Sequence, residues 1–197
     1  MLQKPQGYDE ATVGGGDYTP LSVGGHYLTI LRVREIMLRD QYPALEIVFD
    51  THSTDDQPGY YQASYNSSKE RFPDAKYQGV YNLFLPTGDP NSDTYKWSTQ
   101  RLKGFITSVE ESNSGYVFDW QTASLKGKSV GGVFGEEEYI NRDGEVKTAV
   151  RLRYFCSTDS VPTAKPPKLK EAKNKPVRRA NVTDPHPDDA GSLPFDL

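Results

Sequence analysis

The stretch KGKSVGGVFGEEEYINRDGEVKTAVRLRYFC, from Lys126 to Cys156, predicts a long β-hairpin and decides the fold. Residues 128–139 run up and residues 145–156 run back. The turn between them contains Asp143-Gly144, a dipeptide that is a strong local signal for a hairpin. Glycines within the first strand indicate the bulge or sharp bend that a small barrel requires. These glycines are Gly131, Gly132 and Gly135.

Outward from the hairpin, alternating residue patterns predict three more strands. They are expected at residues 26–34, 44–50 and 60–66, where alternate side chains share a face. Residues 67–93 contain repeated prolines and glycines and therefore predict a long connection. Within this connection, residues 80–85 suit an additional strand.

One helix is expected at residues 98–113, because four apolar residues recur at helical spacing and form a single stripe. They are Leu102, Phe105, Ile106 and Val109. Ser98 is the expected N-cap, and Asn113 begins the expected end of the helix. Gly104 is expected to mark close packing of the helix against a sheet.

Three strands, a helix and two further strands follow the order of the OB-fold. The sequence therefore predicts an all-β domain with one helix, closed as a five-stranded OB-fold barrel. An open α+β sheet is the alternative. Residues 23–157 are the expected domain, and residues 1–22 are an expected flexible arm. Residues 158–197 are expected to be disordered, with a basic linker and an acidic tip, because their apolar content is too low to fold.

Charge and cysteine content restrict the function. The net charge is −4, so a site for a polyanion has to be a local positive stripe on an acidic background. The single cysteine, Cys156, excludes an internal disulfide and a cysteine-based zinc site. We expect no metal and no cofactor. No apolar run reaches membrane-spanning length, and we expect a soluble protein of a reducing cytoplasm without membrane contact.

The return strand of the hairpin carries the candidate binding face. Alternation places its cations and its last aromatic ring on one side, and arginines recur on the first strand. Cations that neutralise phosphates, together with rings that stack on bases, are typical of single-stranded nucleic-acid sites. The expected DNA contacts are Arg151, Arg153, Lys147, Phe155, Arg32, Arg34, Trp97, Tyr61, Lys128 and Phe134. The alternative is a solvated outer face of an amphipathic strand.

Runs of glutamate raise the possibility of a two-metal nuclease, which we consider the weaker interpretation. These runs are Glu110-Glu111 and Glu136–Glu138. The preferred interpretation is that Glu136 and Glu138 are cross-strand charge partners of Lys147 and its neighbours. We therefore expect a protein that is not an enzyme.

Two segments, LKGFITSVEESN at residues 102–113 and LKGKSVGGVFGEEEY at residues 125–139, carry a resemblance. The chain is similar to a family of proteins encoded by phages of Gram-positive bacteria and regarded as single-stranded DNA-binding. The similarity covers residues 24–157 and is strongest from residue 102. It implies sequence-independent binding of single-stranded DNA during phage DNA replication and recombination.

The C-terminal tip carries a second resemblance, in the residues Asp188, Asp189, Leu193, Pro194 and Phe195. Bacterial and phage single-stranded DNA-binding proteins end in an acidic tip that closes on Pro-Phe, and this chain departs by continuing to Asp196-Leu197. The resemblance implies that the tip recruits replication or recombination proteins. A protein-interaction adaptor that does not bind nucleic acid is the alternative function, and a homodimer is left open.

Overall fold

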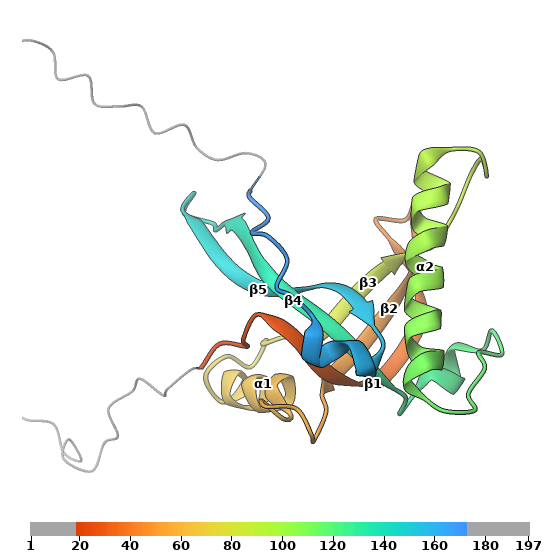
Figure 1. Cartoon of the computed structure of the whole chain (residues 1–197). Coiled ribbons are helices and arrows are strands. Elements are labelled where there is room, and N and C mark those ends of the chain that lie inside the picture. Colours follow the sequence, from red (N-terminus) through yellow and green to blue (C-terminus); the bar gives the residue numbers. More distant parts are fainter. Residues whose placement is uncertain (1–18, 173–197) are drawn as a thin grey trace, which may run out of the picture.

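The computed structural model describes residues 19–172, which form one five-stranded antiparallel sheet with two α-helices (Figure 1). The strand order is β3-β2-β1-β4-β5. The elements are β1 Gly24–Leu38, β2 Tyr42–Thr51, α1 Tyr60–Arg71, β3 Val80–Phe84, α2 Asp93–Ser112, β4 Ser129–Ile140 and β5 Val146–Cys156, with short 3-10 turns η1 Thr122–Leu125 and η2 Thr158–Thr163. A sheet of this order with a helix inserted between β3 and β4 is compatible with an OB-like fold.

Closure of the sheet into a barrel is not observed. The edge strands β3 and β5 form no ladder with each other in the described part of the chain. Side chains join them instead, since the rings of Tyr81 and Phe155 lie edge to face with centroids 5.4 Å apart. Arg101 of α2 donates hydrogen bonds to the Tyr81 hydroxyl and, over 3.1 Å, to the Arg153 carbonyl oxygen. The seam between β3 and β5 is therefore held by α2.

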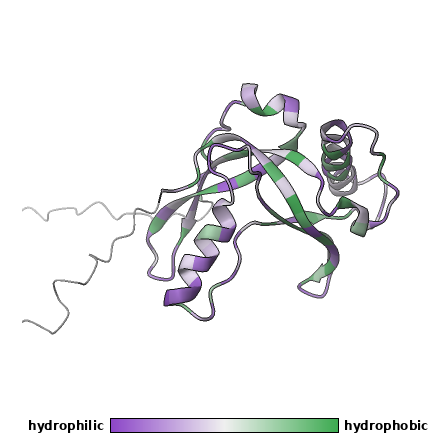
Figure 2. Ribbon diagram, turned by 90° about the horizontal axis from the view of Figure 1, so that it is seen from below, coloured by the Kyte–Doolittle hydropathy of each residue, from purple (hydrophilic) through white to green (hydrophobic). Residues whose placement is uncertain are grey.

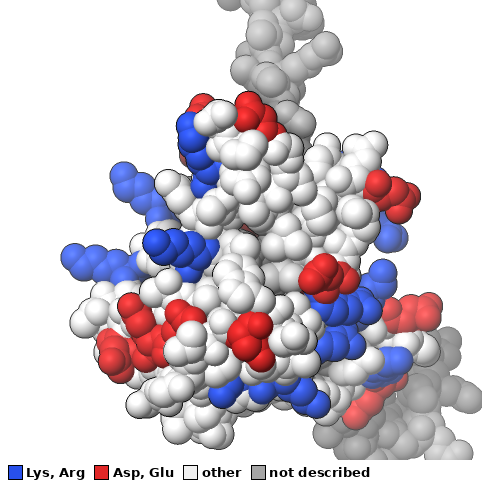
Figure 3. Space-filling view, turned by 90° about the vertical axis from the view of Figure 1, so that its right-hand side faces the viewer, with Lys and Arg blue, Asp and Glu red and all other residues white. Residues whose placement is uncertain are grey.

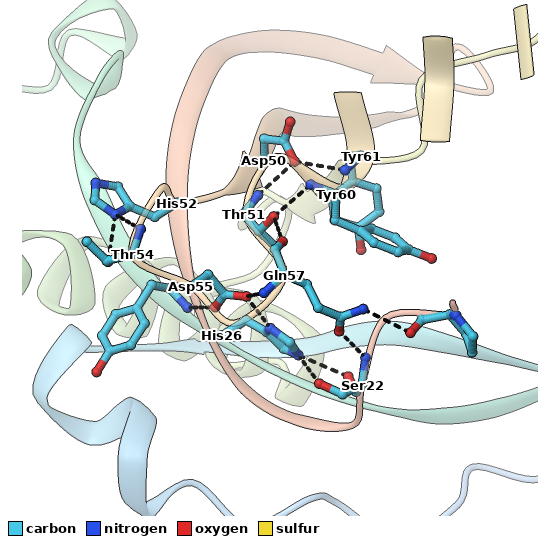
Figure 4. A network of polar contacts seen from close by, with 12 residues as sticks. Ser22, His26, Asp50, Thr51, His52, Thr54, Asp55, Gln57, Tyr60 and Tyr61 are labelled. Carbon is cyan, nitrogen blue, oxygen red and sulfur yellow. Dashed lines mark hydrogen bonds and ion pairs between the residues drawn. The ribbon is translucent and has the colours of Figure 1, made fainter. Parts of the chain in front are cut away.

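The predicted third strand is wrong, because residues 60–66 lie in α1 and the third strand forms at Val80–Phe84. The N-terminus of α1 is capped by the end of β2 (Figure 4). The Asp50 carboxylate accepts the backbone N–H groups of Tyr61 and Gln62, and the Thr51 hydroxyl accepts that of Tyr60. These bonds satisfy donors that a helix start leaves without partners.

The remaining predicted elements agree more closely with the structure. Both strands of the hairpin and the turn between them lie where the sequence placed them. The helix α2 begins earlier than expected, at Asp93, with Ser92 as its N-cap. Ser98 is a buried residue inside the helix, and its hydroxyl donates to the carbonyl oxygens of the preceding turn.

Two bulges reverse the inward and outward faces of β1 and β5. The register between β1 and β2 shifts at Leu31, and the register between β4 and β5 shifts at Arg153, so each of these residues is additional in its strand. Val33 is therefore buried on the same face as Ile30, although simple alternation predicts that these two residues lie on opposite faces of β1. One extra residue in a strand moves every following side chain to the other face of the sheet.

The core lies between the sheet and α2, and apolar residues follow the strands (Figure 2). Phe49, Phe105 and Phe134 are its largest fully buried side chains. The segment after β5 packs on β1 and β4, because Val161 of η2 is buried and its carbonyl oxygen would clash with a Cβ on Gly25. Leu21, before β1, is buried as well.

The chain beyond residue 157 stays associated with the domain, so the expectation of disorder is wrong for residues 158–172. Lys170 runs beside β4, donating its N–H to the Glu136 carbonyl and accepting from the Glu138 N–H. The ordered domain therefore exceeds the expected residues 23–157 at both ends. No helix within residues 19–172 has the length and apolar character to cross a membrane.

Candidate nucleic-acid interface

A groove of about 900 Å³ opens along the seam, between the β4–β5 hairpin on one side and α1, β3 and α2 on the other. Its charged lining residues are Arg101, Arg151, Arg153, Lys170, Glu136 and Glu137, and its aromatic ones are Phe49, Tyr60, Tyr61, Tyr81, Trp97 and Tyr139. The groove therefore combines cations with rings, on elements that lie far apart in the sequence.

Three arginines give the groove its positive charge. Within residues 19–172, Arg101, Arg151 and Arg153 form no ion pair with a carboxylate. The Arg153 guanidinium donates to the Glu136 backbone carbonyl at 3.2 Å, which leaves its charge unneutralised. Lys170 is different, because its ammonium is paired with the Glu137 carboxylate. The arginine charges remain available to an anionic ligand.

The aromatic side chains differ in how far they are open to solvent. Trp97 is 52% exposed, and the Arg101 guanidinium lies 5.3 Å from the centre of its ring. Tyr139 is also exposed. Tyr61 lines the groove but is only 8% exposed, because its ring packs edge to face on Phe49. Trp97 is therefore the groove ring best placed to stack on a planar ligand.

The structure brings four of the ten predicted contact residues into this groove, namely Arg151, Arg153, Trp97 and Tyr61. Lys147 and Lys128, two of the other predicted residues, lie outside the groove and contact neighbouring side chains. The Lys147 ammonium pairs with Glu145 at the hairpin end, 2.9 Å away. The Lys128 ammonium lies 4.2 Å from the centre of the Tyr116 ring.

The predicted arginines of β1 share one carboxylate. Arg34 forms two hydrogen bonds to Glu46, at 2.8 and 2.9 Å, and Arg32 forms a third at 3.2 Å. The hydrogen bond from Arg34 is the main reason that the pKa of Glu46 lies below its ordinary value, and it also raises the pKa of Arg34. One carboxylate thus holds both guanidinium groups in place and matches one of their two positive charges.

The predicted placement of two phenylalanines on the binding face is wrong. Phe134 is fully buried in the core. Phe155 follows the bulge at Arg153 and therefore turns inward, where its ring lies 4.8 Å from that of Phe105. Neither ring shares a face with Arg151.

The predicted pairing of the glutamate run is also wrong. Glu138 lies opposite Thr148 in the hairpin ladder, and Tyr139 is the residue opposite Lys147. The counter-charge of Glu137 comes from Lys170, in the segment after β5. The Glu138 carboxylate accepts the backbone N–H of Ala172. The run therefore anchors this segment rather than the hairpin.

Sequence reasoning missed Arg101 and Tyr139, and it gave Lys170 only as one cation of the basic linker. Arg101 follows Trp97 by one helical turn, a signal that was lost because the helix was expected to begin at Ser98. Lys170 enters the groove only through the path of the chain after β5. No local pattern carries that information.

A buried polar network lies at the start of β1 (Figure 4). The His26 ring is 2% exposed, with Nδ1 at 2.9 Å from Asp55 and Nε2 at 3.0 Å from the carbonyl oxygen of Ser22 and 3.1 Å from its hydroxyl. Asp55 also accepts the backbone N–H groups of Tyr27 and Gln57. Although it contains serine, histidine and aspartate, the network ties β1 to the loop after β2, which is a structural role.

Acidic and basic side chains are interspersed on the face that carries α2 (Figure 3). No group of three or more potential ligands gathers to hold a metal ion within residues 19–172. The predicted tip residues, from Asp188 to Phe195, lie outside the described residues. No known protein family matches the chain, and no curated protein matches it.

Proposed function

We propose that this protein binds single-stranded DNA without sequence preference, in the groove between the β4–β5 hairpin and α2. The observation that carries the proposal is the position of three arginines without carboxylate partners in the described chain beside the exposed ring of Trp97. Local cations of this kind suit a polyanion even though the whole chain has a net charge of −4.

Each class of side chain has its own part in the mechanism. Arg151 and Arg153 neutralise phosphates, and their planar guanidinium groups suit phosphate oxygens. Trp97 and Tyr139, the exposed rings of the groove, stack on bases, which every base permits because every base has a π-face. Bases in a duplex are already stacked and paired, so this arrangement favours a single strand.

The biological role rests on the two resemblances. In phage DNA replication and recombination, the domain protects the strand while the tip from Asp188 to Phe195 recruits partner enzymes. An acidic segment with an isolated aromatic residue suits a partner with a basic, apolar docking site.

Intrinsic fluorescence tests the proposal, because the chain contains only two tryptophans. Trp120 lies outside the groove and is 76% exposed, so it is the matched control for Trp97. We expect oligo-dT to quench the variant Trp120→Phe, which keeps Trp97, and to leave Trp97→Phe nearly unquenched. Affinity should fall with salt, with a logarithmic slope near −0.7 per phosphate neutralised.

The same titrations with duplex DNA and RNA, each at two salt concentrations, define the ligand class. Weaker binding of the duplex supports the single-strand proposal. The absence of both quenching and an anisotropy change with every nucleic acid would refute it and favour the adaptor function.

A further inference from the structure

A smaller pocket of about 190 Å³ lies beside the groove, where α2 crosses the seam. Its lining residues are Tyr81 and Leu83 of β3, Trp97, Gln100, Arg101, Gly104 and Phe105 of α2, and Tyr154 and Phe155 of β5. Leu83 and Phe105 are buried and form its apolar floor, whereas Trp97 and Tyr154 are exposed at its mouth. The pocket is therefore open to solvent and aromatic on several sides.

The pocket depends on a glycine in the middle of a helix. Gly104 shares a helical stripe with Trp97, Gln100 and Arg101, so a side chain here would point toward the seam. A Cβ built on Gly104 meets nothing within 4 Å, which contradicts the expectation that this glycine marks close packing. Glycine is less favourable than alanine inside a helix, yet no neighbouring atom requires it here.

We propose that this pocket accepts one nucleobase of the strand bound in the groove, an inference that rests on the proposed function. Tyr81, Trp97 and Arg101 line both spaces, so the pocket continues the groove. A strand whose phosphates lie on Arg151 and Arg153 can therefore turn one base into the seam. The other bases stay in the groove.

The lining chemistry suits a base of any identity. The rings of Trp97 and Tyr154 offer stacking surfaces, and the floor excludes water from the flat faces. Gln100 is the polar side chain at the mouth whose amide both donates and accepts hydrogen bonds, so it can serve the edge of more than one base. The pocket thus adds affinity without sequence selection.

Filling the pocket tests this proposal in the full-length chain. Gly104→Leu places an apolar side chain in the space, and Thr99→Leu adds the same side chain to α2 outside the pocket lining, also without a charge change. We expect Gly104→Leu to weaken oligo-dT binding about tenfold, the loss of roughly one stacked base. Binding of an abasic oligonucleotide of equal length should not change, because its phosphates are retained. Thr99→Leu should change neither affinity.

Wild-type affinity of Gly104→Leu for oligo-dT would overturn the proposal. Thermal melting establishes that this variant folds, with a melting temperature at or above that of the wild type, since leucine favours helix. If the variant does not fold, photo-crosslinking of the wild type to 5-iodouracil oligonucleotides decides. Crosslinks at Tyr154, which lines the pocket but not the groove, support the pocket, and crosslinks confined to Trp97 or to other residues overturn it. If the wild type binds no oligonucleotide, the proposed function itself fails, whereas a folded Gly104→Leu variant that binds oligo-dT as the wild type does refutes only the pocket.

Discussion

Two pairs of arginines on the same sheet have different surroundings. Arg32 and Arg34 on β1 converge on the carboxylate of Glu46. Arg151 and Arg153 on β5 line a groove and form no ion pair with a described residue. In the sequence, both pairs are alternate arginines on a strand. The difference shows that the location of the nearest carboxylate, which the strand pattern does not contain, decides whether an arginine remains available for an anion.

The two pairs provide a charge-matched experiment on the proposed function. Arg151→Gln with Arg153→Gln, and Arg32→Gln with Arg34→Gln, both change the net charge from −4 to −6. We expect the β5 variant to lose about ten- to a hundredfold in affinity for oligo-dT, because each arginine contributes a charge-assisted hydrogen bond. The β1 variant should change by less than about twofold, since distant exposed charges are screened by salt.

Fluorescence anisotropy at several salt concentrations measures this difference. The salt dependence of the β5 variant should become shallower by about 0.7 per lost phosphate contact, and that of the β1 variant should keep the wild-type slope. Equal losses in the two variants would show that net charge, rather than the groove, governs binding.

Much of the fold could be predicted from the sequence, because its signals are local. The hairpin follows from Asp143-Gly144 between two strand patterns, and α2 follows from its apolar stripe. α1 could not be predicted, because its helix has no apolar stripe and its cap comes from Asp50 and Thr51, at the end of another strand. Tertiary capping here overrides a tyrosine-rich alternation that is typical of a strand.

The candidate site could be predicted only in part. Arg151 and Trp97 were found from charge and ring content alone. Phe155 was misplaced because the bulge at Arg153 reverses the alternation, and a bulge depends on pairing with β4. Arg101 and Lys170 reach the groove through the packing of α2 and of the chain after β5. Sequence alternation within one strand contains neither kind of information.

A substitution at Glu46 tests the same comparison by changing the carboxylate in place of the arginines. Glu46→Gln removes the shared carboxylate of Arg32 and Arg34, so we expect a rise of about twofold in affinity for DNA at low salt, because two cations are released. Stability should fall only slightly at neutral pH, since both arginines of these ion pairs are exposed and solvent screens their charge. Anisotropy and thermal melting measure these effects.

The acid dependence of stability provides the control. The folded-state pKa of Glu46 is depressed, so its contribution to stability is present above the ordinary carboxyl pKa and is lost as pH falls through the lower folded value. The difference in melting temperature between wild type and Glu46→Gln should therefore shrink in acid. A difference that does not change with pH would show that the carboxylate is not stabilised by these arginines.

The last prediction concerns Cys156, at the end of β5, whose sulfur lies beside Gly131 of β4 and Val161 of η2. Its thiol is half-buried, and burial raises its pKa. Because the thiolate is the reactive form, we expect iodoacetamide to alkylate Cys156 several-fold more slowly in the folded protein than after denaturation, with the pH profile shifted upward. A cysteine at the exposed position 151, introduced as Arg151→Cys with Cys156→Ser, should react at nearly the rate of a free thiol. If Cys156 reacted equally fast when folded, η2 would not cover this end of β5, and the packing of the segment after β5 on β4 would be wrong.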